Sequence, residues 1–292
     1  MTLFLKSFNR TTKIKIFTIA FIINAFFFPK ILCEKFVLGP RRVGFFSNFF
    51  GVLNYLAWME KEEDEFMVYW DKKSLYYQKE GFNGVTHNVW EYYFEPIFDD
   101  VVYQEGDSIC RKFSPSPGNE FIFYRISLYY REKAKKLIDK YIRIKPIVLK
   151  KINYFYDTYM SNKRTVGVYW RGTDKCKERR KVSQEEILLE AKKNADSKMQ
   201  FLIVSDEMSF IQKAKEILSE DKIIHYDCFR SSDGTPIHKG VYSRAQAGED
   251  VLVEVMLLSR CDKLIFTYSN VSAGVLYFNP QLDSIPVGVP YL

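Results

Sequence analysis

Residues 165–175 read TVGVYWRGTDK, and the chain changes character at this stretch. After it, strand and helix patterns alternate regularly, whereas the chain before it shows no such series. Residues 165–169 are predicted to form a short strand that follows a polar cluster at residues 161–164. Arg171 and Asp174 therefore come just after the carboxyl end of a strand, the edge where open α/β sheets bind ligands.

The second half of the chain predicts a parallel sheet. Residues 199–204 form a continuous apolar run, which is typical of a strand buried on both faces. Ser183 begins a capping box in which the Glu186 side chain reaches back, and this pattern predicts the start of a helix. Further elements are predicted in the order helix 209–218, strand 222–225, helix 249–260, strand 263–268 and a helix from residue 271. Such an alternating series predicts an α/β fold with a doubly wound parallel sheet.

Charged residues follow the first two of these strands. Arg171 offers a rigid fork that can pair bidentately with a pyrophosphate, and Lys175 offers a point charge for the same oxygens. Asp206 follows the next strand and could accept hydrogen bonds from a base or a ribose. The alternative for Arg171 and Asp174 is a surface ion pair.

The strand at residues 263–268 ends in Ser269 and Asn270, followed by Ser272 at the predicted start of a helix. The hydroxyls, the amide and the unpaired backbone N–H groups of a helix start could hold a phosphate. A plain N-cap is the alternative for the two serines. Three polar clusters at successive strand ends together favour a ligand site over the separate structural explanations.

Composition and motifs narrow the class of ligand. The chain has 292 residues, 47% of them hydrophobic and 27% charged, so it is globular and long enough for two domains. Its net charge is +7, but basic residues within the first fifteen supply four of these charges, and no nucleic-acid-binding motif occurs. Five Cys without a C-x-x-C pair and three His predict no metal site. Neither G-x-G-x-x-G nor a P-loop occurs, so a pyrophosphate site points to a nucleotide sugar.

Residues 1–33 are predicted to be a signal peptide or a signal-anchor. Basic residues precede an apolar run at residues 16–28, a layout that fits a secretory signal. The run is shorter than the roughly 20 residues of a membrane span. An uncleaved anchor stays the alternative, with membrane association through residues 14–33. Either form predicts a lumenal or extracytoplasmic protein, and a cytoplasmic one if the segment is not a signal.

The part between this segment and the boundary at residue 160 has a less regular pattern. Residues 34–160 are predicted to form an N-terminal lobe on the acceptor side, and residues 161–292 a C-terminal lobe that binds the nucleotide sugar. Residues 43–58 are predicted to form a strand, a glycine-bearing turn and a helix, and the turn with Gly44 and Asn48 could approach a ligand.

Residues 88–96 concentrate aromatic side chains beside Glu91 and Glu95. Such a surface could hold an acceptor sugar. Core packing is favoured, because large aromatic side chains are mostly buried.

Four blocks resemble, in order and spacing, those of the α-1,6-fucosyltransferase and NodZ-like superfamily, which also includes protein O-fucosyltransferases. The blocks are residues 168–175, 204–207, 250–259 and 264–272. The resemblance covers about the last 130 residues well and the first half only loosely. It implies a two-lobed, GT-B-like fold, transfer from GDP-fucose or another GDP-sugar to a glycan or glycoprotein with inversion, and no metal or other cofactor.

By position, Arg171 resembles the arginine with which the family grips the β-phosphate. Asp206 and Glu254 resemble the acidic residues near the guanosine, and residues 269–272 the polar phosphate loop. Asp174, Lys175, Gly44 and Asn48 are predicted to bind the donor as well.

The chain also departs from the family pattern. Tyr169 stands where relatives usually have His, and Gly172 where the α-1,6 enzymes have a second Arg. Glu178 matches a glutamate of some relatives only with a shift of one position. The catalytic base is therefore left open between Glu178, Glu91 or Glu95 and the leaving phosphate. Two other functions also stay open, a nucleotide-binding module without catalysis and a secreted carbohydrate-binding protein.

Overall fold

The computed structural model describes residues 36–62, 66–98, 109–110, 119–172, 182–234 and 243–290. The predicted signal or anchor at residues 1–33 lies outside the described residues. Among the helices that are described, none combines the length and the hydropathy needed to cross a membrane.

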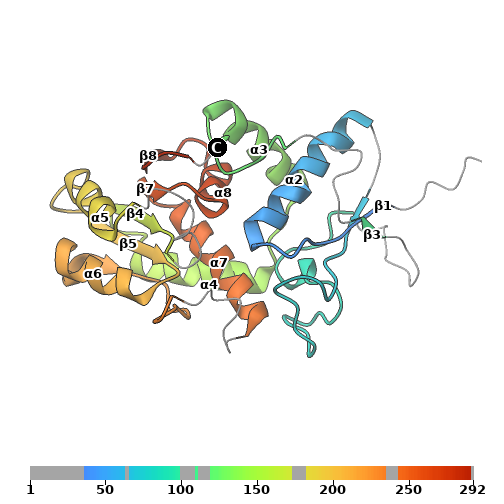
Figure 1. Ribbon diagram of the computed structural model, residues 1–292, viewed down its shortest axis with the longest axis horizontal. Helices are drawn as coiled ribbons and strands as arrows, with labels where there is room; N and C mark the ends of the chain where they lie inside the picture. Colours follow the sequence, from blue (N-terminus) through green and yellow to red (C-terminus); the bar gives the residue numbers. More distant parts are fainter. Residues whose placement is uncertain are drawn as a thin grey trace, which may run out of the picture. The chain divides into compact units, whose positions relative to one another are not determined.

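A five-stranded parallel sheet forms the centre of the second half (Figure 1). Its strand order is β6-β5-β4-β7-β8, so the order reverses direction beside β4. The strands are β4 (Thr165–Trp170), β5 (Gln200–Ser205), β6 (Ile223–Ile224), β7 (Lys263–Thr267) and β8 (Asp283–Val287). A reversal of this kind is a topological switch point, and ligands bind in the crevice outside the strand ends there.

Helices cover both faces of this sheet, which confirms the predicted doubly wound arrangement (Figure 1). On one face, Val166, Val168 and Trp170 of β4 pack against α5 (Gln184–Lys193) and α6 (Met208–Leu218). The other face carries α7 (Arg244–Leu258) and α8 (Asn270–Phe278). Every residue of β4 and β5 is buried, as a strand covered on both sides requires.

Three details of this half differ from the sequence-based expectations. Ser183 caps α5 by accepting from the Glu186 amide as predicted, but the Glu186 carboxylate accepts no return bond from the Ser183 amide among the described residues. Helix α7 begins at Arg244 rather than residue 249, because its first turns bury Glu249 and Asp250, which look like surface residues in the sequence. Strand β8 was not predicted because it contains Pro286, which an edge strand tolerates.

The first half combines a small sheet with helices. The sheet has the order β2-β1-β3, and β1 pairs with β3 in parallel. The elements are β1 (Phe36–Leu38), α2 (Phe45–Glu62), β2 (Phe66–Val68), the 3-10 helix η2 (Trp90–Tyr92), β3 (Ile109–Cys110), α3 (Leu128–Tyr141) and α4 (Pro146–Tyr159).

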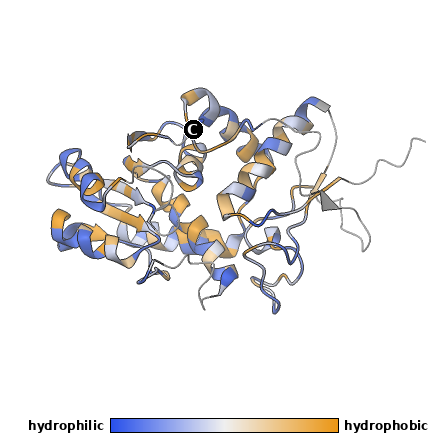
Figure 2. Cartoon of the chain, viewed as in Figure 1, coloured by the Kyte–Doolittle hydropathy of each residue, from blue (hydrophilic) through white to orange (hydrophobic). Residues whose placement is uncertain are grey.

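The predicted strand and turn at residues 43–51 are wrong, because α2 begins at Phe45. Its first residues are buried on all sides of the helix, and periodicity cannot distinguish such a run from a strand. In Figure 2, hydrophobic residues (orange) occur along α2 and along α7. The aromatic segment at 88–96 is core, as favoured: Trp90 and Phe94 are buried, and their rings stack with centroids 4.3 Å apart.

The first half contacts the second through aromatic rings that lie directly on α7 and α8. A Cβ atom on Gly274 of α8 would stand 2.6 Å from the buried Phe46 ring. Tyr93 donates its hydroxyl proton to the Ala245 carbonyl of α7 at 2.9 Å. Asn83, at the tip of a tight turn, donates to the fully buried Glu249 carboxylate at 2.9 Å, and Lys151 of α4 pairs with the same carboxylate. The start of α2 is thereby held against α8, while the boundary at residue 160 stays a prediction.

We expect Gly274→Ala to lower the free energy of unfolding by up to about 2 kcal/mol. Overpacking costs about 1–3 kcal/mol, and the gain in helix propensity returns about 1 kcal/mol. Urea unfolding measures the change. Gly44→Ala is the matched control, since a Cβ there meets no atom within 4 Å. Phe46→Leu combined with Gly274→Ala should recover stability, and a double variant as unstable as the single one would contradict the ring contact.

Candidate functional site

The ends of three strands meet at the switch point. The Arg171 amide donates to Thr267 Oγ1 of β7 at 3.4 Å, and the Gly172 amide donates to Asp206 Oδ1 beyond β5 at 2.8 Å. The chain after β4 is therefore tied to the strand on each side of it. Arg171 itself is partly exposed at this edge, directly after the buried Trp170. The structure thus brings Arg171, Asp206 and the β7 end together, as their positions after parallel strands predict.

The start of α8 is built by two serines that cap each other. Ser269 Oγ accepts from the Ser272 amide at 3.1 Å, and Ser272 Oγ accepts from the Ser269 amide at 2.9 Å. Both residues are buried, so their hydroxyls serve the helix rather than face a ligand. What α8 offers at this edge is the positive end of its dipole and the N–H groups of its first turn.

Asn270, the first residue of α8, carries the only side-chain atom of the described residues that is buried without a hydrogen-bond partner, its Oδ1. An unmet buried acceptor costs free energy. Because Oδ1 is an acceptor, its complement is a hydroxyl or N–H donor and not a phosphate oxygen. Of the Asn270 amide, only the Nδ2 group could donate to a phosphate oxygen, as the predicted role requires.

Tyr169 of β4 contacts the N-cap of α8. Its hydroxyl lies 3.2 Å from Ser269 Oγ, which donates to it. Tyr169 is buried, and burial raises the pKa of its phenol well above the ordinary value. Tyr169 is thus a neutral phenol that supports the α8 cap, and it cannot serve as a general base near neutral pH.

Gly172 lies where there is no room for a side chain. A Cβ atom there would collide with the Glu207 carboxylate and stand 2.6 Å from the Trp170 ring. Trp170 cannot move aside, since it is buried and its Nε1 donates to the Val182 carbonyl at 2.9 Å. The space that an arginine would need in the α-1,6 pattern is occupied by Glu207 in this chain.

Glu254 lies on α7 next to this edge and is paired with Arg230. The Arg230 guanidinium donates to Glu254 Oε1 at 2.9 Å, and the thiol of Cys228 lies 3.4 Å from the same oxygen. Burial raises the pKa of the Glu254 carboxyl above its ordinary value, and the charge of Arg230 opposes that shift. The sequence pattern does not indicate Arg230, because a single arginine in a polar loop forms no recognisable motif.

The other predicted site residues are more dispersed. The Asn48 side chain accepts from the Arg41 amide at 2.9 Å and donates to the Arg41 carbonyl at 3.0 Å, so it fixes the loop before α2. Gly44 ends that loop. Glu91 accepts from Asn88 at 2.7 Å, and Glu95 lies in the chain after the aromatic core. Three further predicted residues, Asp174, Lys175 and Glu178, lie outside the described residues.

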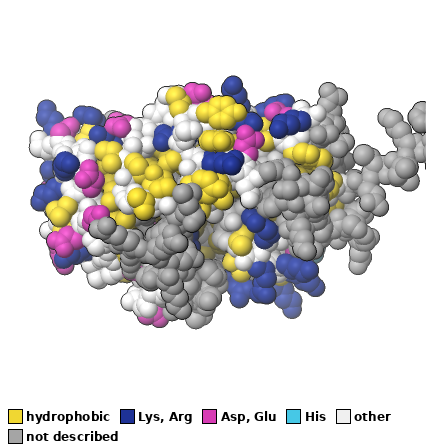
Figure 3. All heavy atoms as spheres, turned by 45° about the horizontal axis from the view of Figure 1, so that its top comes forward, with side chains coloured by type: hydrophobic (Ala, Val, Ile, Leu, Met, Phe, Trp, Pro, Cys, Tyr) yellow, Lys and Arg dark blue, Asp and Glu magenta, His cyan; other side chains and the backbone are white. Residues whose placement is uncertain are grey.

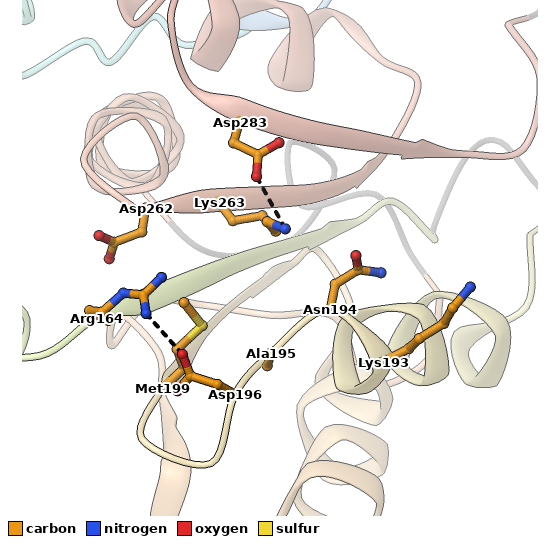
Figure 4. A pocket seen from close by; sticks show the side chains of 9 residues that line it. All are labelled: Arg164, Lys193, Asn194, Ala195, Asp196, Met199, Asp262, Lys263 and Asp283. Atoms are coloured by element: carbon orange, nitrogen blue, oxygen red, sulfur yellow. Dashed lines mark hydrogen bonds and ion pairs between the residues drawn. The ribbon is translucent and has the colours of Figure 1, made fainter.

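A polar cavity of about 440 Å³ lies at the opposite, amino-terminal edge of the sheet (Figure 4). Two ion pairs line it, Arg164 with Asp196 at 2.9 Å and Lys263 with Asp283 at 3.1 Å. These charges neutralise each other, and the cavity is remote from the switch point along β4. We therefore assign the candidate site to the carboxyl edge.

Figure 3 shows one face of the surface, on which Lys and Arg side chains are distributed with hydrophobic side chains between them. At the lower right of this view, several Lys and Arg side chains lie together. The predicted absence of a nucleic-acid partner stays a prediction.

Solved structures share this arrangement. NodZ α-1,6-fucosyltransferase, in a crystal soaked with GDP-fucose, matches with a TM-score of 0.57 and 14% identity over 85% of this chain and 93% of that chain. Fucosyltransferase NodZ from Bradyrhizobium matches with a TM-score of 0.56 and 15% identity over 84% of this chain and 92% of that chain. The fold is that of the NodZ fucosyltransferases.

The NodZ match confirms the predicted GT-B-like α/β fold, and at 14–15% identity it concerns the fold alone. A third NodZ structure, co-crystallised with GDP, matches with a TM-score of 0.50 and 14% identity over 84% of this chain and 91% of that chain. No protein-family model and no curated protein matches the sequence.

We expect Gly172→Ala to lower the free energy of unfolding by about 1–3 kcal/mol, because the new methyl group overpacks the site. Glu207→Ala in the same chain should recover part of the loss, since it removes one of the two collisions, while Trp170 remains. Glu207→Ala alone is the control and should change stability by less than about 0.5 kcal/mol. Chemical denaturation of the four proteins measures this, and full stability of Gly172→Ala would show that the site has room for a side chain.

Proposed function

We propose that this protein is a fucosyltransferase-like glycosyltransferase that moves a sugar from GDP-fucose or another GDP-sugar to a hydroxyl of a glycan or glycoprotein. The observation that carries the proposal is the switch point, where Arg171 and the start of α8 face one edge of a sheet with the NodZ fold. A guanidinium beside a helix N-terminus is suited to a pyrophosphate. A NodZ enzyme with this fold has been solved in a crystal soaked with GDP-fucose, which supports the choice of donor.

The proposed reaction is an in-line displacement without a metal ion. The acceptor oxygen attacks C1 of the sugar, the bond from C1 to the β-phosphate oxygen breaks, and its electron pair leaves with GDP. Attack from the face opposite the leaving group inverts the anomeric carbon. Arg171, with the N–H groups of α8 and with Lys175, neutralises the charge that develops on the leaving phosphate. Asp174 is proposed to support the same region.

The acceptor proton requires a base, and Tyr169 is unsuitable for it. Glu178, Glu91 and Glu95 stay the candidates, together with the leaving phosphate itself. At the nucleoside end, Asp206 and Glu254 are proposed to accept hydrogen bonds from the ribose and the base. Asp206 is held for this task by the Gly172 amide.

We expect Arg171→Ala to weaken GDP binding roughly 10- to 100-fold, which is the range for losing hydrogen bonds to a charged group. Isothermal titration calorimetry measures the affinity. Arg164→Ala is the matched control, because Arg164 precedes the same strand at its other end and pairs with Asp196. The GDP affinity of Arg164→Ala should stay within about twofold of wild type, since an exposed ion pair contributes little to stability. Equal affinity of Arg171→Ala and wild type would refute the phosphate role.

We expect GDP-fucose to release GDP faster when a glycan or glycoprotein acceptor is present, with no loss of rate after EDTA treatment and with inverted product stereochemistry. A coupled GDP assay over a panel of GDP-sugars measures donor choice, and NMR of the product reports the anomer. Release of GDP only after a divalent ion is restored would contradict the metal-independent mechanism. GDP binding without turnover of any donor would favour the alternative, a nucleotide-binding module.

The location of the protein follows from residues 1–33. We propose that they carry it into a secretory or extracytoplasmic compartment, either as a cleaved signal or as an anchor. N-terminal sequencing of the mature protein distinguishes the two.

A further inference from the structure

Arg230 is a buried cation at the carboxyl edge of the sheet. Its side chain is 2% exposed, and one guanidinium reaches three separate parts of the fold. It donates to the Ser205 carbonyl at the end of β5 at 2.9 Å, to the Tyr226 carbonyl of its own loop at 3.0 Å and to Glu254 of α7 at 2.9 Å. Two further backbone bonds, between residues 231 and 206 and between 208 and 231, hold this loop beside the end of β5.

The Glu254 carboxylate is held on one side only. Arg230 and the Cys228 thiol both donate to Oε1. No described residue donates to Oε2, and this oxygen is not among the fully enclosed polar atoms that lack a partner. The network thus fixes the carboxylate from inside the protein and leaves its second oxygen for a donor outside.

If the only role of the Arg230–Glu254 ion pair were to hold this loop in place, burying it would be energetically unfavourable. Burying two charges costs several kcal/mol for each ion, and apolar residues of similar size often stabilise as well or better. A buried ion pair is explained if the ionised Glu254 carboxylate binds a ligand. A carboxylate oxygen accepts from N–H groups, and guanine presents such donors where adenine presents an acceptor nitrogen.

We infer that Arg230 is a positioning residue for base selection: it holds Glu254 as an oriented carboxylate whose Oε2 accepts from the N–H edge of a guanine base. The inference rests on the proposed function and deepens it, since it names the residue that makes the site prefer a guanine nucleotide. Arg230 touches no part of the substrate and acts only through Glu254.

Removing the guanidinium should also make binding sensitive to pH. The titratable groups that face Glu254 are Arg230 and Cys228 of the loop, Asp206 after β5 and Tyr169 of β4. Burial and Asp206 raise the pKa of Glu254, and Arg230 is the group that lowers it most. Without Arg230 the folded-state pKa of Glu254 rises further, so the carboxylate gains a proton as the pH falls and then accepts more weakly from an N–H.

The experiment measures the affinities of GDP and ADP by calorimetry between about pH 8 and about pH 6, a range in which a free Glu is ionised. We expect wild type to prefer GDP at every pH. Arg230→Met should reduce the ratio of GDP to ADP affinity at least about tenfold, the loss of one hydrogen bond to a charged group. Its remaining GDP affinity should fall as the pH is lowered, and Arg230→Lys should retain part of the preference.

Two further variants keep the test independent of folding. Arg230→Met with Glu254→Leu removes both charges, which avoids an unpaired buried ion, and should show no base preference and no pH dependence. Arg260→Met is the control, since Arg260 follows the end of α7 and contacts Asn153 and the Tyr156 ring. The Arg260→Met variant should have the same ratio of GDP to ADP affinity and the same pH dependence as wild type.

The failures are distinguishable. A wild-type ratio and pH profile in Arg230→Met would overturn the role of Arg230. A wild-type ratio in the double variant would overturn the role of Glu254 and with it the whole inference, while GDP binding by wild type would leave the proposed function standing. Wild type that binds no GDP would overturn the proposed function and this inference with it.

Discussion

The hydrogen bond from the Gly172 amide to Asp206 is the link on which the carboxyl edge depends. It turns the chain across the end of β5 immediately after β4, while the Arg171 amide reaches Thr267 on the other side. Arg171 is thereby fixed between two strand ends by its backbone. The geometry demands glycine at residue 172, because Trp170 and Glu207 fill the remaining space.

The two residues at which the chain differs from the resemblance seen in its sequence, Tyr169 and Gly172, both have structural roles. The Tyr169 phenol supports the cap of α8. Gly172 lets the chain pass beside Trp170. Both residues belong to the scaffold on which Arg171 and the first turn of α8, the proposed anion-binding groups, are placed.

Much of the C-terminal half could be predicted because each strand is a continuous apolar run and each helix has a clear face. The polar ends of β4, β5 and β7 could also be placed at one edge, since parallel strands end on the same side of a sheet. The limits have equally definite causes. Pro286 lies within the edge strand β8, so the sequence of this segment did not predict a strand. The start of α2 is uniformly apolar, and hydrophobic periodicity could not distinguish a helix from a strand there. Arg230 could not be found, because its importance comes from contacts with residues 24 and 25 positions away.

The two halves are joined in a way that bears on the site. Phe46 lies on Gly274 of α8, and the Asn83 turn reaches Glu249 of α7. These same two helices carry the proposed donor contacts, the start of α8 near Arg171 and Glu254 near Arg230. A displacement of the first half would therefore act on α7 and α8 directly, because packed aromatic rings and buried polar bonds transmit strain rather than absorb it. Contacts with these two helices thus link the first half of the chain to the residues proposed to bind the nucleotide.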